Sequence, residues 1–256
     1  MEHQAERIAA IYDIHGNLPA LEAALAEIDC DDVDLIVVGG DVAAGPMPGA
    51  VIERLRSIGD RARFVRGNAD RLMVAAYDDA ATQGAPPAVE WAAAQLSSGE
   101  RDFLASFQDN VVVDVVGIGA IRFCHGSPRS DEEILTSLTS DTRLAPILSG
   151  VVEPIVVCGH THVQFDRTFE RWRVLNAGSV GMPYEVPTGA RWLRIGPEIE
   201  HRVTNYDIDQ AAAVIRRAGY PDVEEWIDSY MRNPTPASDA STFFEDMAIK
   251  REEQNL

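Results

Sequence analysis

Apolar residues near the N-terminus form short continuous runs that alternate with segments in which they recur every three or four positions. The runs Arg7–Tyr12, Asp34–Val38 and Arg63–Arg66 have the length and composition of buried strands. Helical spacing appears between the runs, first at Leu18, Leu21, Leu25 and Ile28, and then at Val51, Ile52, Leu55 and Ile58. This β-α-β-α-β order predicts a parallel sheet with right-handed crossover connections.

The remainder of the chain predicts two helical regions on either side of a group of strands. Residues 69–109 are rich in alanine and polar residues and are expected to form two or three helices, one of them capped by Ser97 with Glu100. From residue 206 onward the pattern is helical, and we expect its last helix, around Phe243, to be short. Strands are predicted at Val111–Val116, Ala120–Cys124, Ile155–Cys158, Gln164–Phe169, Arg173–Asn176, Arg191–Ile195 and Glu198–Thr204.

Two further helices are predicted among the later strands. One is capped by Ser130 with Glu133, and the other covers Asp141–Leu148. The whole order fits a mixed sheet that doubles into two layers with helices on both faces. We predict a single domain over residues 1–256, with a helical insertion at about 69–109 and a C-terminal helical extension at about 206–256.

Composition and charge limit the classes of function. The net charge of −19 disfavours bulk nucleic-acid binding, because a duplex binder needs a basic face. No apolar run approaches the length of a membrane span or of a secretory signal, so we expect no membrane association. The three cysteines include no C-x-x-C pair, which favours a cytoplasmic location. Cys124 and Cys158 lie close to histidines, and we interpret them as small buried residues rather than ligands.

Four of the six histidines belong to an ordered series of short polar motifs, each of which follows an apolar run. The motifs are Asp13-Ile14-His15, Gly40-Asp41, Gly67-Asn68, His125-Gly126 and Gly159-His160-Thr161-His162. Residues i and i+2 of an extended segment point to the same side, so Asp13 with His15, and His160 with His162, are each expected to aim two ligands at one place. Strand C-termini are where α/β sheets collect their sites, and carboxylate oxygen with imidazole nitrogen suits divalent metals. The series therefore predicts a metal-dependent hydrolase with two divalent metals.

These motifs resemble those of the calcineurin-like metallophosphoesterase superfamily, and most closely those of its small prokaryotic phosphodiesterases. The resemblance implies an α/β fold, a four-layer α/β/β/α sandwich of mixed sheets with a binuclear metal site at the C-terminal ends of strands. It implies one metal bound by Asp13, His15, His162 and a shared Asp41, and a second bound by Asp41, Asn68, His125 and His160. A hydroxide that bridges the metals would attack phosphorus in line, and Asp41, Asn68 and His125 are the predicted catalytic residues.

The chain departs from many members of this superfamily directly after the Gly-Asn pair. Those members carry a histidine there, usually interpreted as the acid that protonates the leaving group, whereas this chain has Ala69. The loss of a general acid matters most for a poor leaving group such as a serine alkoxide, and little for a phosphate or an aryl oxide. We therefore predict hydrolysis of a phosphodiester or a nucleotide phosphoanhydride. The alternatives are a phosphomonoesterase, protein phosphatases included, and a non-catalytic scaffold of the same fold.

Two arginines are candidate substrate-binding residues, because a guanidinium suits bidentate phosphate binding. They are Arg66, directly before Gly67, and Arg129; for each, the alternative is an ion pair with a nearby acid. Mixed nitrogen and oxygen ligation admits Mn, Fe, Zn, Co or Ni, and manganese is our prediction for activity. The expected partner is a small phosphorylated substrate, while the sequence leaves the oligomeric state open.

Polar residues beside the motifs have structural interpretations. Asn17 and Asp70 are expected to open helices, and the alternative for Asp70 is a carboxylate that orients a ligating histidine. The glycine-containing loop 176–181 is expected to form a tight turn.

Overall fold

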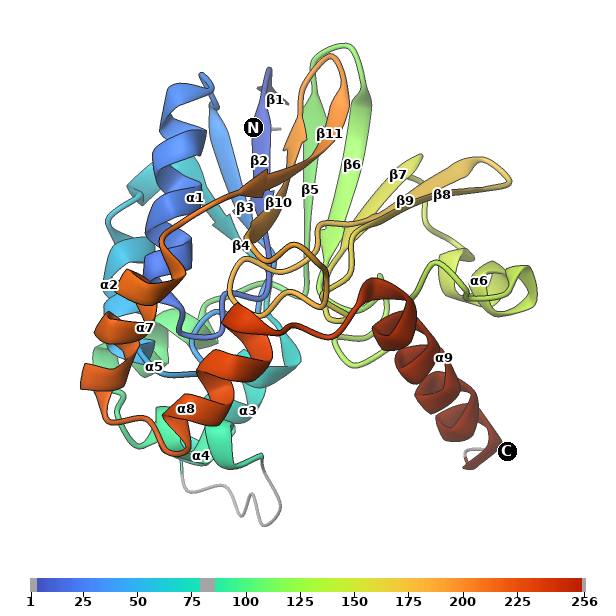
Figure 1. The fold of residues 1–256 in the computed structure, drawn as a ribbon. Helices are drawn as coiled ribbons and strands as arrows, with labels where there is room; N and C mark the ends of the chain where they lie inside the picture. The colour runs from blue at the N-terminus through green and yellow to red at the C-terminus, as the bar shows by residue number, and fades with distance from the viewer. Residues whose placement is uncertain (1–3, 79–85, 255–256) are drawn as a thin grey trace.

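Two β-sheets face each other and helices cover their outer faces in the computed structural model, which describes residues 4–78 and 86–254 (Figure 1). The first sheet has the strand order β11-β10-β2-β3-β4, and the second has the order β1-β5-β6-β7-β9-β8. In the first sheet β2, β3 and β4 are parallel, as predicted, while β10 is antiparallel to β2. In the second, β5 and β6 form an antiparallel hairpin. The predicted four-layer sandwich of mixed sheets is confirmed.

The strands have the following bounds. The first sheet contains β2 (Ile8–Ile11), β3 (Leu35–Val38), β4 (Ala62–Phe64), β10 (Ala190–Ile195) and β11 (Ile199–Thr204). The second sheet contains β1 (Gln4–Ala5), β5 (Asn110–Val115), β6 (Gly119–Cys124), β7 (Ile155–Cys158), β8 (Phe165–Phe169) and β9 (Trp172–Asn176). Strand β1 was not predicted, because a strand of two residues has no recognisable periodicity.

The helices fall into three groups along the chain. The first group is α1 (Leu18–Cys30), α2 (Pro48–Arg56) and the short 3₁₀-helix η1 (Gly59–Arg61). The predicted insertion contains α3 (Asn68–Tyr77), α4 (Pro87–Ala93) and α5 (Ser98–Ala105), and its residues 79–85 lie outside the described residues. After α6 (Asp141–Leu148) come the C-terminal elements α7 (Ile208–Ile215), η2 (Arg216–Ala218), α8 (Val223–Ile227), the π-helix η3 (Asp228–Arg232) and α9 (Ala237–Gln254).

Strand β2 shows why helices are needed on the outer faces. Its residues Ala9 and Ile11 belong to the core beneath α1 and α2, whereas Ile8 and Ala10 belong to the core between the sheets. Successive side chains of a strand point to opposite faces, so a strand that is apolar throughout must be covered on both. A third core lies between α6 and the outer face of the second sheet. These three cores separate the four layers.

Helix α1 follows directly from its sequence. The side chain of Asn17 accepts a hydrogen bond from the backbone N–H of Ala20, and Pro19 occupies the first turn, where its missing N–H costs nothing. The predicted stripe is confirmed, since Leu21, Leu25 and Ile28 are buried against the first sheet. Asn17 also donates to the carbonyl of Gly181 at 2.9 Å, so the same residue connects the start of α1 to the loop that follows β9.

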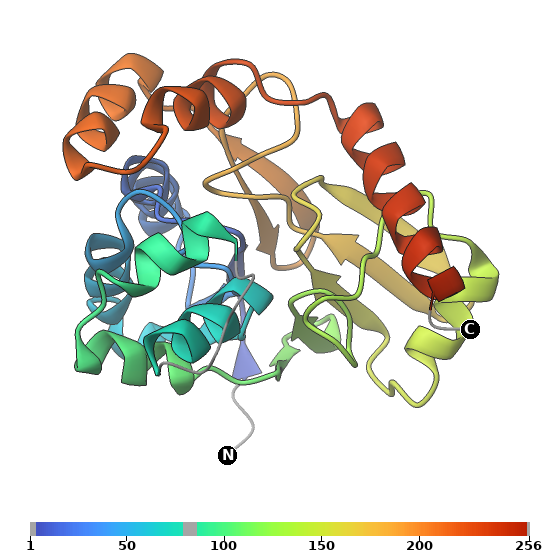
Figure 2. The same ribbon diagram turned by 90° about the horizontal axis from the view of Figure 1, so that it is seen from below.

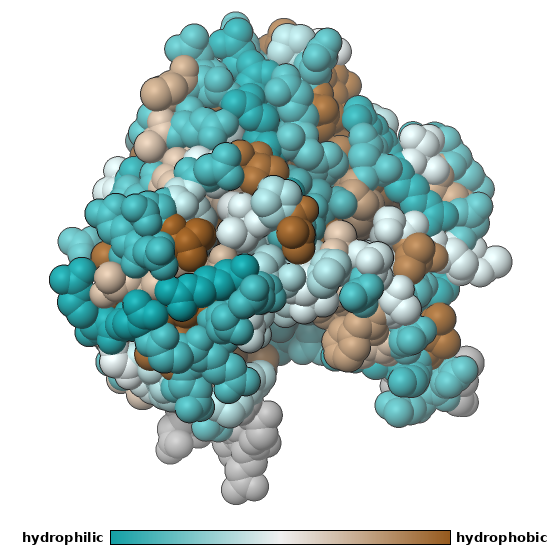
Figure 3. Space-filling view, viewed as in Figure 1, coloured by the Kyte–Doolittle hydropathy of each residue, from teal (hydrophilic) through white to brown (hydrophobic). Residues whose placement is uncertain are grey.

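The C-terminal elements cross the edge of the sandwich at which the parallel strands end. Helix α7 lies beside α1, whereas α9 lies on the other side, near α6 (Figure 1). Seen from below, these elements form an arc around the strand ends (Figure 2). The space-filling view shows a mostly hydrophilic face that is hollowed between α8 and α9 (Figure 3). Any site at these strand ends is therefore bordered by the C-terminal extension.

Two sequence-based predictions about helices are wrong. Residues 131–140 form no helix, because the carboxylate of Glu133 does not cap one; it accepts hydrogen bonds from Ser127 and Arg129 instead. The last helix is not short, since α9 extends from Ala237 to Gln254. The capping box of Ser97 and Glu100 is confirmed at the start of α5.

Within residues 4–78 and 86–254, no helix combines the length and the apolar character that crossing a bilayer requires.

Candidate metal centre

The predicted ligands gather at the C-terminal ends of strands from both sheets. Asp13 and His15 follow β2, Asp41 follows β3, and Asn68 opens α3 after β4. From the second sheet, His125 follows β6, and His160 and His162 follow β7. Six of these side chains form two groups that could each hold a metal ion: Asp13 with His15 and His162, and Asp41 with His125 and His160. Each group combines residues from the two sheets. The expectation that His160 and His162 point to one place is wrong, because they belong to different groups.

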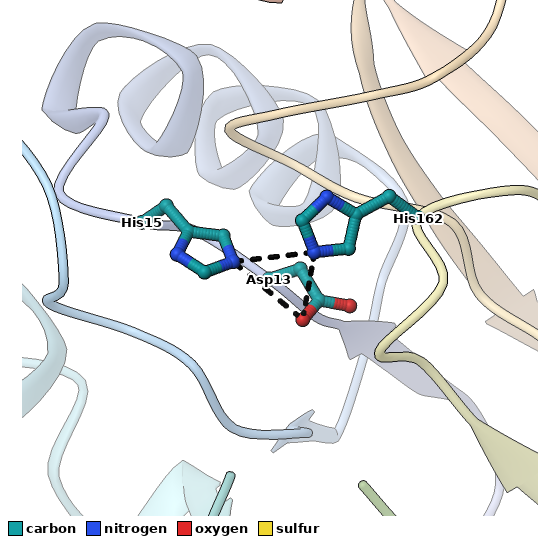
Figure 4. Close-up of side chains that lie close together, drawn as sticks. All are labelled: Asp13, His15 and His162. Carbon is teal, nitrogen blue, oxygen red and sulfur yellow. Dashed lines mark hydrogen bonds and ion pairs between the residues drawn. The ribbon is translucent and has the colours of Figure 1, made fainter. Parts of the chain in front are cut away.

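In the first group, three side chains converge on one point (Figure 4). The Nε2 atoms of His15 and His162 are 3.2 Å apart, and Nε2 of His162 lies 3.4 Å from Oδ1 of Asp13. The other ring nitrogens are fixed, since Nδ1 of His15 lies 3.1 Å from the carbonyl oxygen of Ala44 and Nδ1 of His162 lies 2.8 Å from that of Met182. A carbonyl only accepts, so Nδ1 carries the proton and a neutral ring presents a bare Nε2 lone pair to the group.

Two bare nitrogens at this distance repel each other unless a cation lies between them. Burial lowers the pKa of His15, which keeps its ring neutral. Oδ1 of Asp13 is buried and finds no hydrogen-bond partner within the described part of the chain. A buried carboxylate oxygen without a partner is costly, and a metal ion would satisfy it. The donor set of one carboxylate and two imidazoles therefore fits a divalent metal.

The second group is built in the same way. Nδ1 of His125 donates to the carbonyl of Gly39 at 2.9 Å, while its Nε2 lies 3.4 Å from Oδ2 of Asp41 and 3.1 Å from Oδ1 of Asn68. Asn68 therefore lies with this group, as predicted. The ring of His160 packs against that of His125, with centroids 5.2 Å apart.

The pKa values in the second group show that its carboxylates favour a nearby positive charge. Burial lowers the pKa of His125, but the carboxylates of Asp41 and Asp13 outweigh it and raise the pKa to about 10. Burial and the charge of His125 lower the pKa of His160 to about 4. Burial opposes ionisation of Asp41, yet the charge of His125 holds its pKa well below the usual range. The carboxylates thus favour a cation in their midst, which a metal ion would supply in place of the His125 proton.

The backbone at the site is held in unusual conformations. Asp13, His15, Asp41, His160 and His162 all have positive φ, between 46° and 67°. Such φ values are uncommon outside glycine, cost on the order of 1–2 kcal/mol each, and cluster at functional sites.

Glycines let the strand ends approach the ligands closely. A Cβ at Gly67 would lie 2.1 Å from Oδ1 of Asp41, and one at Gly159 would lie 2.6 Å from Oδ2 of Asp13. Glycine is needed at these two positions because a larger residue would collide with a carboxylate of the site.

Asp70 has a role that sequence reasoning missed. It is fully buried and accepts the backbone N–H groups of Asp41, Val42 and Gly67 at 2.8, 3.0 and 3.0 Å. It does not orient a histidine; it joins the turn after β3 to the turn after β4, in addition to opening α3. Burial and the charge of Asp41 raise the pKa of Asp70 to about 7, against the effect of these donors. In the sequence, an aspartate three residues after Gly67 indicates only a helix cap, and its distant backbone partners could not be predicted.

The loop 176–181 supports the first group from behind. Ser179 Oγ and the backbone N–H of Gly181 both donate to the carbonyl of Asp13, at 2.7 and 3.0 Å. Asn176 donates to the carbonyl of Gly159 at 2.7 Å. The loop thus holds the backbone of Asp13 and Gly159 in place. Cys124 and Cys158 are buried as expected.

The two candidate arginines line one polar cavity of about 320 Å³, and none of its lining residues is a candidate metal ligand. Arg66 forms an ion pair with Asp109, and Arg129 binds Glu133 through both Nε and Nη2. Arg71, which the sequence analysis did not single out, lines the same cavity and is paired with Asp131 and Glu132. Each arginine therefore has a carboxylate partner with which a bound anion must compete.

Comparisons with known proteins agree with this geometry. Residues 7–192 match a family model described as the calcineurin-like phosphoesterase superfamily domain. A metallophosphoesterase from Sphaerobacter thermophilus has a similar structure, with a TM-score of 0.66 and 25% identity over 86% of this chain and 97% of that one. A hypothetical protein from Pyrococcus horikoshii OT3 has a TM-score of 0.75 and 19% identity over 88% of this chain and 96% of that one. No curated protein matches the chain by sequence.

The family model covers more than half of the chain and all of the ligand motifs. The chain belongs to the calcineurin-like phosphoesterase superfamily.

Proposed function

We propose that this protein is a metal-dependent phosphoester hydrolase that acts on diesters or phosphoanhydrides. The observation that carries the proposal is the pair of buried ligand groups, in which fixed imidazoles and a carboxylate oxygen without a partner face a common point. Membership of the superfamily supports phosphoester hydrolysis, and the choice of diester or anhydride rests on the chain's own residues.

Two divalent metals are the proposed cofactors, with manganese as the metal of the active enzyme. We assign Asp13, His15 and His162 to the first metal, and Asn68, His125 and His160 to the second, with Asp41 shared between them. Oδ2 of Asp41 supports the sharing, since it lies 3.4 Å from Nε2 of His125 and 3.8 Å from Nε2 of His15. When bound, the metals would supply Lewis acidity and a water of lowered pKa.

The environment of Ala69 supports a substrate with a good leaving group. Ala69 is buried, and its backbone N–H donates to Oδ1 of Asp41 at 2.7 Å. Its methyl side chain has no proton to give to a leaving group. The neighbouring Asp70 turns its carboxyl toward backbone N–H groups and away from the ligand groups. Neither residue can protonate a leaving group, which disfavours alkoxides such as that of serine.

Arg66 is the proposed contact for a substrate phosphate. Its Nε is buried and has no hydrogen-bond partner within the described residues, although Nη2 is paired with Asp109. A phosphate oxygen in the cavity would satisfy this donor. Arg129 is the weaker candidate, because its Nε and Nη2 already donate to the carboxylate of Glu133.

The proposal is tested by measuring metal content and Mn²⁺-dependent hydrolysis of bis-p-nitrophenyl phosphate and p-nitrophenyl phosphate, with Asp41→Asn as the comparison. We expect about two metals per chain and diester hydrolysis that the variant loses. A dominant monoester rate would identify a phosphomonoesterase despite Ala69. Protein that binds no metal and stays inactive with Mn²⁺ would identify a scaffold and end the proposal.

A further inference from the structure

The C-terminal extension reaches the metal centre through one aromatic side chain. Tyr184 lies in the loop before β10, and its ring is nearly parallel to the imidazole of His162, with an interplanar angle of 15° and centroids 5.1 Å apart. The same loop holds His162 at two further points. The carbonyl of Met182 accepts from Nδ1 of His162 at 2.8 Å, and the backbone N–H of Tyr184 donates to the carbonyl of His162 at 3.2 Å.

These contacts leave the imidazole of His162 little freedom. The hydrogen bond to Met182 fixes one edge of the ring, and the stacked phenol covers one of its faces. The remaining edge, with Nε2, is directed at Asp13 and His15 (Figure 4). The partners of a ligating histidine set its orientation, and their loss commonly lowers metal affinity 10- to 100-fold.

Tyr184 is in turn held by two C-terminal elements. Tyr230, from the π-helix η3, lies with its ring centroid 6.1 Å from that of Tyr184. Phe244, from α9, lies 5.8 Å from the same ring. Both elements follow residue 192, where the match to the family model ends. The aromatic contact to His162 therefore depends on parts of the chain outside that match.

Helix α9 is anchored by a buried carboxylate beside Phe244. The residue after Phe244 is Glu245, which is buried and accepts hydrogen bonds from Thr136 Oγ1 at 2.7 Å and Thr139 Oγ1 at 3.0 Å. Its other oxygen binds Arg143 at 2.5 Å. This anchor fixes the turn of α9 that carries Phe244.

We infer that Tyr184 is a positioning residue for His162, and that the C-terminal extension completes the first metal site by holding Tyr184 in place. The inference rests on the metal centre proposed above. It predicts that the two metal sites respond differently to changes in the extension. Within residues 4–78 and 86–254, the ring of Tyr184 contacts that of His162 but not those of His125 and His160.

Calorimetric titration of the metal-free full chain with Mn²⁺ tests the inference. We expect Tyr184→Leu, which removes the stacked ring, to weaken one of the two sites about ten-fold or more and to leave the other unchanged. Tyr184→Phe keeps the ring and should bind both ions like the wild type. Phe244→Ala should weaken the same site by a smaller factor, and it decides the question should Tyr184→Leu fail to fold.

The neighbouring residue supplies a matched control. Phe243 is 60% exposed and contacts Phe244 but not Tyr184, so Phe243→Ala should leave both affinities unchanged. Wild-type affinities in both Tyr184→Leu and Phe244→Ala would overturn the inference, and so would an equal loss at both sites. Wild-type protein that binds fewer than two Mn²⁺ ions contradicts the proposed centre itself, which distinguishes that failure from failure of the inference.

Discussion

The anchor of α9 provides a sharp test of how the extension is held. Glu245 and Glu252 bind the same guanidinium, that of Arg143, from two turns of one helix. The side chain of Glu245 is 11% exposed and that of Glu252 is 51% exposed. Because solvent weakens exposed ion pairs, we expect nearly all of the stabilisation to come from Glu245.

The magnitude follows from the contacts. Glu245→Ala removes one charge-assisted hydrogen bond, worth about 1.5–3 kcal/mol, and two hydroxyl bonds. The hydroxyls of Thr136 and Thr139 are 3.4 Å apart and can bond to each other, so roughly one further bond of about 1 kcal/mol is lost. The expected cost is therefore about 3 kcal/mol, whereas Glu252→Gln should cost less than about 1 kcal/mol.

Urea unfolding of the metal-free protein measures the global part of this loss, and hydrogen exchange of the α9 amides measures any local detachment. Glu245→Gln keeps an acceptor for the hydroxyls and should fall between the two variants above. The reasoning is refuted if Glu245→Ala matches Glu252→Gln in both measurements.

Three other outcomes are expected. Gly67→Ala should lower Mn²⁺ affinity in a calorimetric titration, because its Cβ would lie 2.1 Å from Oδ1 of Asp41. Gly99→Ala should not, because its Cβ would make only an ordinary contact with Arg56, at 3.8 Å. Ser97→Ala should lower the unfolding free energy in urea by about 1 kcal/mol through loss of the α5 cap, and unchanged stability would contradict it. In metal-free protein, the unfolding free energy of wild type relative to Asp70→Asn should fall as pH rises from about 4 to about 7. The folded state binds an extra proton at Asp70 over that range, since its pKa is raised to about 7, and a rise with pH would contradict this.

The positions of the proposed ligands were predictable because each one follows a strand. The runs before Asp13, Asp41 and His160 are apolar throughout, which marks them as buried parallel strands whose ends share one edge. The order of the strands in each sheet could not be read in this way, because pairing depends on contacts between distant segments. Strand β10, for example, pairs with β2 although β2 precedes it by most of the chain.

The contacts of polar side chains were the least predictable. Asp70 binds backbone groups about 28 residues away, and no local pattern specifies that partner. Ser130 with Glu133 matches a helix cap in sequence, but Arg129 and Ser127 take up the carboxylate. Helix α9 is longer than its sparse apolar residues suggest, because a buried charge at Glu245 contributes to its docking.

The division of each ligand group between the two sheets has a consequence for unfolding. His15 and His162 are 147 residues apart in the chain, yet both belong to the first group. A metal held between them is a cross-link that closes a long loop, as a disulfide would, and it opposes separation of the sheets. Loading the centre should therefore slow the unfolding rate more than it speeds folding, unless the strand ends already meet in the transition state. The same atoms that are assigned to chemistry would then also set how long the sandwich survives once folded.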